Sequence, residues 1–274
     1  MVSIASFAAP HFLPPQSLPA GAATATRSLS IRHPLAAVAI CLFAIASASA
    51  DDHSKVNGSV EVAAGQQAGD VDTVNGSIRI EEGATVGDVE TVNGSVRIAD
   101  RASAKHVSSV NGGVSLGAGA KADSMETVNG KMQLGEGAQV AGDVTAVNGA
   151  MTLSQGASVS GELANVNGVM TLEGAHVGKD LRTTNGDITL RAGTRVDGGI
   201  LVKKNTGFFN WHRRNPRIVI GPDTVVAGTL RFEQEVDLFV SDRAKVGAIE
   251  GAKPVMLTVD EAGKSIPKDE KVEK

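Results

Sequence analysis

Histidines are the side chains of this chain best suited to proton transfer near neutral pH. Beyond the first 50 residues they lie at His53, His106, His176 and His212. Their spacings match no metal-binding motif, and no serine or carboxylate accompanies them in a nucleophilic or phosphate-binding pattern. We therefore expect no catalytic residue, no cofactor-binding residue and no metal ligand, and we expect His106 to be a solvated turn residue.

Carboxylates at equivalent places of successive segments are the second candidate. They are Asp70, Asp88, Asp143, Glu162 and Asp180. A row of carboxylate oxygens could bind calcium. His106 and Ser124 interrupt the row, and the glycine-rich nonapeptide of calcium-binding repeats is missing. The pattern therefore favours solvated turn residues over a calcium site.

The segment 203–217 combines five basic residues and three aromatic ones with no acidic residue. The candidate contact residues are Lys203, Lys204, Phe208, Phe209, Trp211, Arg213 and Arg214. Residues 51–202 carry 11 basic and 19 acidic side chains, so the segment contrasts with an acidic body. It could contact anionic lipid headgroups or lipopolysaccharide, or its aromatic side chains could fold back onto the body. The net charge of −4 gives no reason to expect nucleic acid as a partner.

An eighteen-residue repeat must position all these residues. The dipeptide Asn-Gly recurs along the chain in constant phase. Its asparagines are Asn57, Asn75, Asn93, Asn111, Asn129, Asn148, Asn167 and Asn185. We predict that they turn a corner, because both residue types tolerate left-handed backbone angles, and that their amides form a ladder.

Within one repeat, aliphatic residues step by six, as at Val74, Ile80, Val86 and Val92. Short alternating stretches between them are typical of strands, and no helical apolar stripe occurs. The pattern predicts an all-β fold, a single-stranded parallel β-solenoid with about 18 residues and three short strands per coil. A narrow core of this kind explains why aromatic residues make up only 3% of the chain.

The repeat also predicts the boundaries along the chain. We expect about eight coils in 51–202, a basic aromatic insertion at 203–217, terminal coils or a cap at 218–251, and a flexible charged tail at 252–274. Two of the repeats are longer by one residue, near Ala141 and Ser160, where a bulge could absorb the addition.

Residues 1–50 have the features of a secretory leader. Arg27 and Arg32 precede an apolar run at 35–46, and an Ala-Ser-Ala site ends at Ala50. We predict cleavage after Ala50, export to the periplasm or beyond, and no transmembrane span in the mature chain. The run is shorter than the ~20 residues of a spanning helix, although an uncleaved membrane anchor is the alternative.

The repeated Val-Asn-Gly-Ser-Val/Ile and the Gly-Asp-Val corners resemble two related groups of bacterial repeat proteins. One is the bactofilin-type polymer-forming β-helices, and the other is the putative-adhesin β-solenoids of secreted proteins. The resemblance covers about 55–202 and implies a right-handed, non-catalytic solenoid that assembles end to end. The leader departs from cytosolic bactofilins.

Hexapeptide acyltransferases have coils of the same length, but their coils are left-handed and carry a small residue four places after each aliphatic. Ile78 and Glu90 break that rule; His106 or His176 would be the catalytic base in such an enzyme. Our leading expectation is an exported, non-enzymatic structural or adhesin-like solenoid that self-associates at its first coil. The alternative is a module that binds an anionic envelope surface without polymerising.

Overall fold

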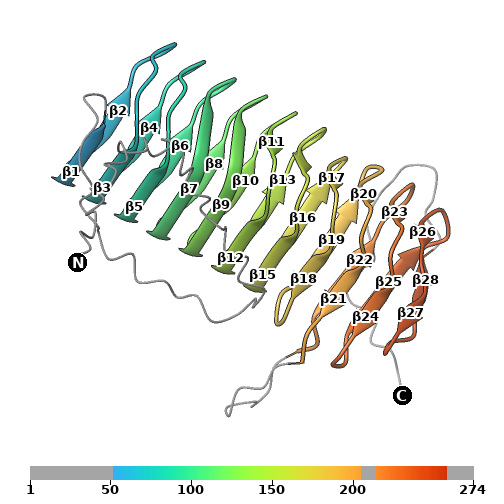
Figure 1. Ribbon diagram of the computed structural model, residues 1–274. Helices are drawn as coiled ribbons and strands as arrows, with labels where there is room; N and C mark the ends of the chain where they lie inside the picture. The colour runs from blue at the N-terminus through green and yellow to red at the C-terminus, as the bar shows by residue number, and fades with distance from the viewer. Residues whose placement is uncertain (1–51, 205–213, 258–274) are drawn as a thin grey trace, which may run out of the picture. The chain divides into compact units, whose positions relative to one another are not determined.

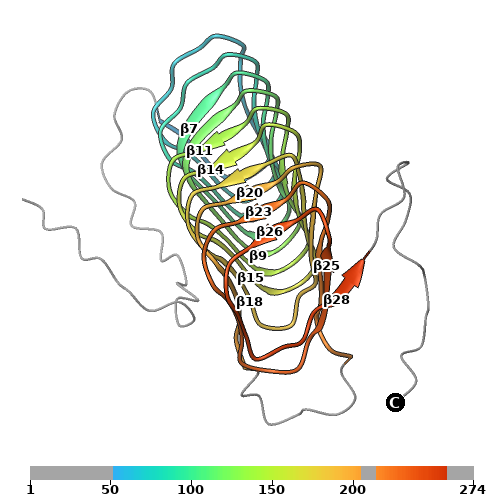
Figure 2. The ribbon, with the colours of Figure 1, turned by 90° about the vertical axis from the view of Figure 1, so that its right-hand side faces the viewer.

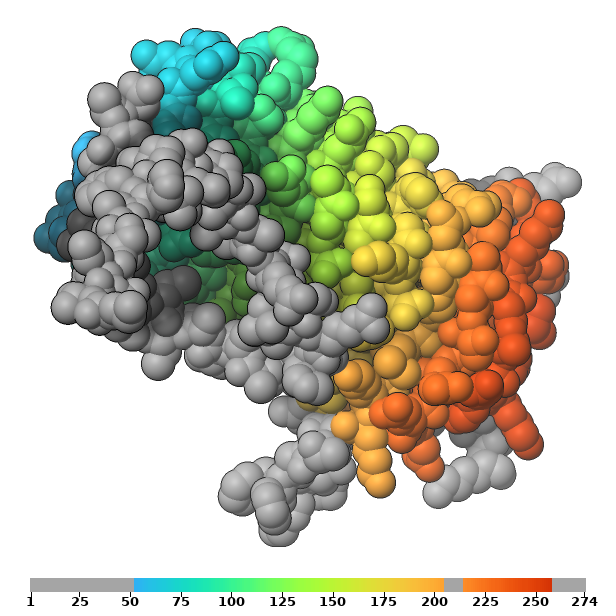
Figure 3. Space-filling model, viewed as in Figure 1, coloured from blue at the N-terminus to red at the C-terminus, as the bar shows by residue number. Residues whose placement is uncertain are grey.

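The computed structural model describes residues 52–204 and 214–257 as a parallel β-solenoid (Figure 1). Its strands stack coil upon coil along the chain, and the view turned by 90° superposes the coil outlines (Figure 2). The all-β solenoid predicted from the repeat is confirmed, since each strand pairs in parallel with its counterpart in the next repeat. In the space-filling view, successive coils form bands that pass from blue to red (Figure 3).

Each coil has up to three faces. The first face leads to the Asn-Gly pair in the coils up to Asn185. It consists of β1 (His53–Asn57), β3 (Val71–Asn75), β5 (Val89–Asn93), β7 (Ser103–Asn111), β9 (Lys121–Asn129), β12 (Val144–Asn148), β15 (Leu163–Asn167), β18 (Leu181–Thr183), β21 (Ile200–Val202), β24 (Leu230–Phe232) and β27 (Ile249–Glu250).

The second face is an 11-stranded sheet with one strand per coil. It consists of β2 (Val60–Val62), β4 (Ile78–Ile80), β6 (Val96–Ile98), β8 (Val114–Leu116), β10 (Met132–Leu134), β13 (Met151–Leu153), β16 (Met170–Glu173), β19 (Ile188–Arg191), β22 (Arg217–Ile220), β25 (Asp237–Ser241) and β28 (Val255–Leu257).

The third face is the shortest. It consists of β11 (Gln139–Val140), β14 (Ser158–Val159), β17 (His176–Val177), β20 (Arg195–Val196), β23 (Val225–Val226) and β26 (Lys245–Val246). In the first coils it is reduced to bridges such as Gln67 with Thr85, and in β7 and β9 it runs straight into the first face.

Three corners join these faces, and we name them for their residues. The Asn-Gly corner joins the first face to the second, and the glycine turn, which follows the second face and carries Gly83 or its equivalent, joins the second to the third. The acidic corner, which holds Asp70 and its equivalents, leads back to the first face.

The core is a column of inward-facing aliphatic side chains. On each strand buried and exposed residues alternate, as on β4 and β10. Met132, Met151 and Met170 lie in register on the second face and are fully buried. Phe232 is the one aromatic residue among the buried core residues of the described ranges, so unbranched and branched aliphatics fill the bore.

The extra residue of the first longer repeat lies in the acidic corner. Val140 pairs with Ala122 at an offset of 18, whereas Val144 pairs with Met125 at an offset of 19. The added residue therefore falls between Val140 and Val144, where it separates β11 from β12, while the flanking strands keep their inward and outward sides.

The C-terminal boundary differs from the expectation. Val255–Leu257 falls in 252–274, where a flexible tail was predicted, yet these residues form β28 and pair with β25. Three strands of the second face, β22, β25 and β28, therefore lie at or beyond the end of the basic segment. The tail was predicted to be flexible because its composition is charged overall. It nevertheless contains a short apolar run, Val255-Met256-Leu257, which adds one more strand to the second face.

Candidate functional site: the corner ladders

The asparagines of the Asn-Gly corner form a continuous ladder. The Nδ2 of each donates to the Oδ1 of its counterpart in the preceding coil, at 2.8–3.1 Å, from Asn75 back to Asn57 and onward to Asn185. Each amide group in the interior of the ladder both donates and accepts. These asparagines therefore hold one coil to the next.

The glycines of this corner are required for a reason other than the expected one. A positive φ is found at only some of them, such as Gly58 and Gly149, and at none of the ladder asparagines. The common cause is close approach: a Cβ added to Gly94 would lie 1.9 Å from the carbonyl oxygen of Gly76. The left-handed turn predicted for the Asn-Gly pairs is thus wrong for most coils, because contact between coils selects the glycine.

A buried hydroxyl ladder supports the same corner and was missed from the sequence. Thr73 Oγ1 donates to the carbonyl oxygen of Gly58 at 3.2 Å, and Thr91 and Thr127 make the equivalent bond in later coils. The signal was available, because threonine or serine stands two residues before the asparagine in four successive repeats. Ala146 breaks the pattern.

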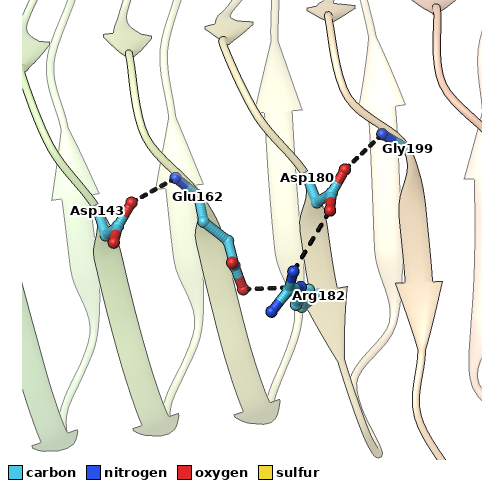
Figure 4. Close-up of polar contacts among 5 residues, drawn as sticks. All are labelled: Asp143, Glu162, Asp180, Arg182 and Gly199. Carbon is cyan, nitrogen blue, oxygen red and sulfur yellow. Dashed lines mark hydrogen bonds and ion pairs between the residues drawn. The ribbon is translucent and has the colours of Figure 1, made fainter. Parts of the chain in front are cut away.

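The carboxylates of the acidic corner are also coil-to-coil links. Asp70 Oδ1 accepts a hydrogen bond from the backbone N–H of Asp88 at 2.9 Å, and Asp88 Oδ1 accepts from that of His106 at 3.2 Å. Asp143 and Asp180 accept likewise from Glu162 and Gly199, each at 2.8 Å (Figure 4). These side chains therefore satisfy main-chain donors that the corner would otherwise leave without a partner.

In the later coils an arginine compensates these charges. Arg182 lies between Glu162 and Asp180, with Nε 3.0 Å from Glu162 Oε1 and an Nη 3.4 Å from Asp180 Oδ2 (Figure 4). Burial raises the pKa of Glu162 above its usual value, and the charge of Arg182 opposes that rise. The result is a half-buried ion-pair network along the first face.

Asp72 is an acidic residue of the early coils, and no cation is among the groups that shift its pKa. Partial burial raises its pKa to about 6, and the charges of Glu90 and Asp70 add to the rise. A hydrogen bond from Ser54 Oγ, at 3.4 Å, acts in the opposite direction. Within 52–204 and 214–257, no group of three or more histidine, cysteine or acidic side chains is arranged to hold a metal ion.

The two candidate histidines lie in different surroundings. His106 Nδ1 is 2.7 Å from Ser124 Oγ on the neighbouring coil, and both residues are half-buried. His176 Nε2 is 2.8 Å from Asp197 Oδ2, and that hydrogen bond, more than the nearby Arg195, holds the pKa of Asp197 below its usual value. Each contact joins adjacent coils, as the other ladders do.

The described part of the basic segment packs on the solenoid. Arg214 forms an ion pair with Asp187, and the guanidinium of Arg217 lies 4.8 Å from the centre of the Phe239 ring. The backbone N–H of Lys203 donates to the carbonyl oxygen of Thr183, and that of Lys204 donates to Glu233. Phe208, Phe209, Trp211 and Arg213 lie outside the described residues, as does His212.

A groove of about 460 Å³ crosses successive coils beside the second face. Its wall includes the outward row Arg97, Ser115, Gln133 and Thr152. Gly117 helps to hollow it, but the carboxylate of Asp100 already excludes a side chain there, at 2.3 Å from a would-be Cβ. Most of its lining residues are polar, and the packing of the coils accounts for the small residue at Gly117.

No family model matches this chain, and neither a curated protein nor a solved structure matches it. The described residues include no helix long and apolar enough to cross a membrane. The site is therefore described by its geometry: in the described coils, the candidate side chains of the corners form hydrogen bonds from coil to coil.

Proposed function

We propose that this chain is an exported, non-enzymatic structural or adhesin-like β-solenoid that associates with a second copy through its C-terminal coil. The observation that carries the proposal is the contrast between the two ends of the described solenoid. Export itself rests on the leader-like sequence of residues 1–50.

The first coil has polar residues where later coils are buried. His53 pairs in register with buried Val71, and Lys55 pairs with buried Thr73. Gln66, next to the Gln67–Thr85 bridge, takes the place of buried Ala84. Lys55 Nζ donates to the carbonyl oxygen of Ser59 at 2.9 Å. Polar side chains at inward positions protect the ends of repeat proteins from edge-to-edge pairing.

The last described coil is apolar at its core positions. Met256 continues the row of buried Val240, yet 60% of its surface is exposed. Ile249 and Val246 continue the rows of buried residues on the first and third faces and are only partly buried. This end therefore leaves core positions without a following coil among the described residues.

The contrast favours association of like ends. Stacking a first coil on a last coil would bury the charge of Lys55 and the polar groups of His53 against aliphatic side chains, which is costly. Two C-terminal coils related by a two-fold axis would bury apolar residues on both sides. Self-association is therefore proposed at the C-terminal coil, whereas the sequence had suggested the first coil.

Sedimentation of the purified protein tests the proposal. We expect a concentration-dependent dimer, and Met256→Asp should weaken it by at least about tenfold, since a buried unpaired charge costs more than about 1.4 kcal/mol. Val56→Asp is the matched control, because Val56 is 69% exposed on the first coil, and it should leave the dimer intact.

Three results would overturn the proposal. A strict monomer at high concentration would remove self-association, and filaments in electron micrographs would show that both ends associate. A dimer that Met256→Asp leaves unchanged would place the interface elsewhere.

Contact with an anionic surface gains no support from the described part of the segment 203–217. Arg214 and Arg217, two of its five basic residues, already engage Asp187 and Phe239. The aromatic residues of the segment lie outside the described ranges, so the proposed self-association rests on the solenoid ends.

A further inference from the structure

Asn-Gly is the dipeptide in which an asparagine side chain is most open to attack by the next backbone nitrogen, because glycine has no Cβ to hinder the approach. In this reaction the side-chain amide is lost as ammonia. The chain carries eight such pairs in its repeats, so the question is which of them the fold leaves able to react.

The interior rungs of the ladder are restrained at both reacting groups. In Asn93, for example, Nδ2 donates to Asn75 and Oδ1 accepts from Asn111, at 3.0 Å each. The attacking N–H, that of Gly94, donates to the carbonyl oxygen of Asn111 at 3.1 Å. The same three bonds recur at Asn75, Asn111, Asn129 and Asn148.

These interior pairs also lie between two coils. The strand β5 pairs with β3 on one side and with β7 on the other. To bring the glycine nitrogen onto the asparagine Cγ, the chain must therefore break pairing with two neighbours at once. Openings of this kind in the middle of a packed stack have a high free energy.

Within the described residues, Asn57 lacks one of the two side-chain bonds and one of the two neighbouring strands, and it keeps the backbone bond of the following glycine. It is the first rung, so its Oδ1 accepts from Asn75 at 3.1 Å while its Nδ2 has no acceptor among the described residues. Its strand, β1, pairs only with β3, and all five residues of β1 are exposed. The bond from the Gly58 N–H to the Asn75 carbonyl, at 2.9 Å, is the one restraint shared with the interior pairs.

We propose that Asn57 is the site at which the folded protein deamidates, and that the ladder protects the interior pairs. The Gly58 nitrogen forms a bond to Asn57 Cγ, the Cγ–Nδ2 bond breaks, and ammonia leaves with the proton from the Gly58 nitrogen. Water then opens the cyclic imide at either carbonyl and gives aspartate or isoaspartate. Isoaspartate lengthens the main chain by one carbon at the end of β1, which removes the register of Asn57 with Asn75.

Peptide mapping by mass spectrometry tests this inference on the purified protein, held folded in mildly alkaline buffer. Acid products at Asn57 should form at least about tenfold faster than at Asn75, Asn93, Asn111, Asn129 or Asn148. That factor corresponds to about 1.4 kcal/mol of additional opening free energy for the interior coils. In concentrated urea the rates should converge, because unfolding removes the ladder.

Asn57→Gln is the matched variant, since the longer side chain keeps a ladder amide but disfavours the five-membered ring. It should abolish the fast conversion and leave the slow interior rates unchanged, with an unaltered thermal unfolding curve. Equal rates at Asn57 and the interior asparagines of the folded protein, or a faster interior site, would overturn the inference. So would an Asn57 rate that stays above the others in urea, because local sequence rather than the fold would then set the order.

Discussion

Two corners of the coil carry a glycine in nearly every repeat, and they require it for different reasons. At the Asn-Gly corner, a Cβ on Gly94 would lie 1.9 Å from a backbone oxygen of the preceding coil. At the glycine turn, Gly83 has φ +67°, and nothing lies within 4 Å of its would-be Cβ. One glycine makes room for a neighbouring coil, whereas the other permits a backbone angle.

The exceptions to each pattern support this distinction. Arg101 occupies the glycine-turn position of its coil with φ 56°, so a side chain is tolerated there. At the Asn-Gly corner no repeat up to Gly186 has another residue in place of the glycine. A steric conflict between two main chains affects both coils, while an unfavourable φ affects one residue only. The following tests vary one reason at a time.

The largest effect is expected for Gly94→Ala. The added Cβ must push two coils apart, and we expect the free energy of unfolding to fall by about 3 kcal/mol or more. Chemical denaturation monitored by circular dichroism measures it. A loss below that of an alanine at the glycine turn would contradict the close-approach explanation.

Thr127→Val tests the hydroxyl ladder beneath the same corner. Valine keeps the shape but removes the 3.1 Å bond to the Gly112 carbonyl, and a buried carbonyl without its donor costs about 1–2 kcal/mol. Ala146 already lacks the hydroxyl in its own coil. Ala146→Val is therefore the control, because it places valine at the equivalent position of another coil without removing a hydrogen bond. It should not show the destabilisation expected for Thr127→Val.

Gly83→Ala separates the two corners directly. The methyl group meets no atom, so only the left-handed angle opposes it, and we expect a loss of about 1 kcal/mol. Denaturation under the conditions used for Gly94→Ala gives the comparison. Equal losses for the two variants would show that the corners do not differ.

The first face adds a pH-dependent test in the early coils. The pKa of Asp72 is raised from 3.8 to about 6, so the folded state binds this proton more tightly than the unfolded state. Its stabilising contribution is present below pH 3.8 and is lost as the pH rises towards 6. Because the carboxyl is half-exposed, we expect the change to stay below about 1 kcal/mol.

Asp72→Asn should remove this component of the pH dependence between pH 3.8 and 6, measured as the difference in unfolding free energy from the parent. A difference that does not vary with pH would contradict the raised pKa.

The smallest effect is expected for Arg101→Gly, which gives its coil the usual residue of the glycine turn. Relief of the left-handed arginine outweighs the loss of its exposed ion pair with Glu82, since such pairs contribute little. We expect a gain of about 0.5 kcal/mol. Glu82→Gln measures the ion pair alone, and a destabilised Arg101→Gly would show that φ is not limiting at this turn.

Much of the fold could be predicted from the repeat before any coordinates. Eight asparagines in phase define the coil length, and the six-residue step of aliphatics at Val74, Ile80 and Val86 marks the three faces, although Val74 lies on the outward side of β3. The inward and outward alternation then leaves one register for stacking, because a slip by one residue would turn the core side chains outward. The hand of the coil stays a prediction of the resemblance.

The roles of the corner residues depended on the tertiary structure. Asp143 is exposed, as expected of a solvated corner residue, but it also accepts a main-chain N–H from Glu162 of the next coil, which the sequence did not predict. The sequence shows which residue types recur, while the partner of each is chosen by the distance between coils, which no local pattern contains. The preference for glycine at position 94 has the same origin.

By itself, the sequence determined the period, the positions of most strands and the aliphatic part of the core, since these follow from side-chain type and spacing along one chain. Only the tertiary structure decided that the two ends are unlike. The register places both Lys55 and Met256 at inward positions, where the charge of Lys55 disfavours burial by a second copy and the apolar side chain of Met256 favours it. A core position is defined by the coil that covers it, and at each end of the described solenoid that coil is missing.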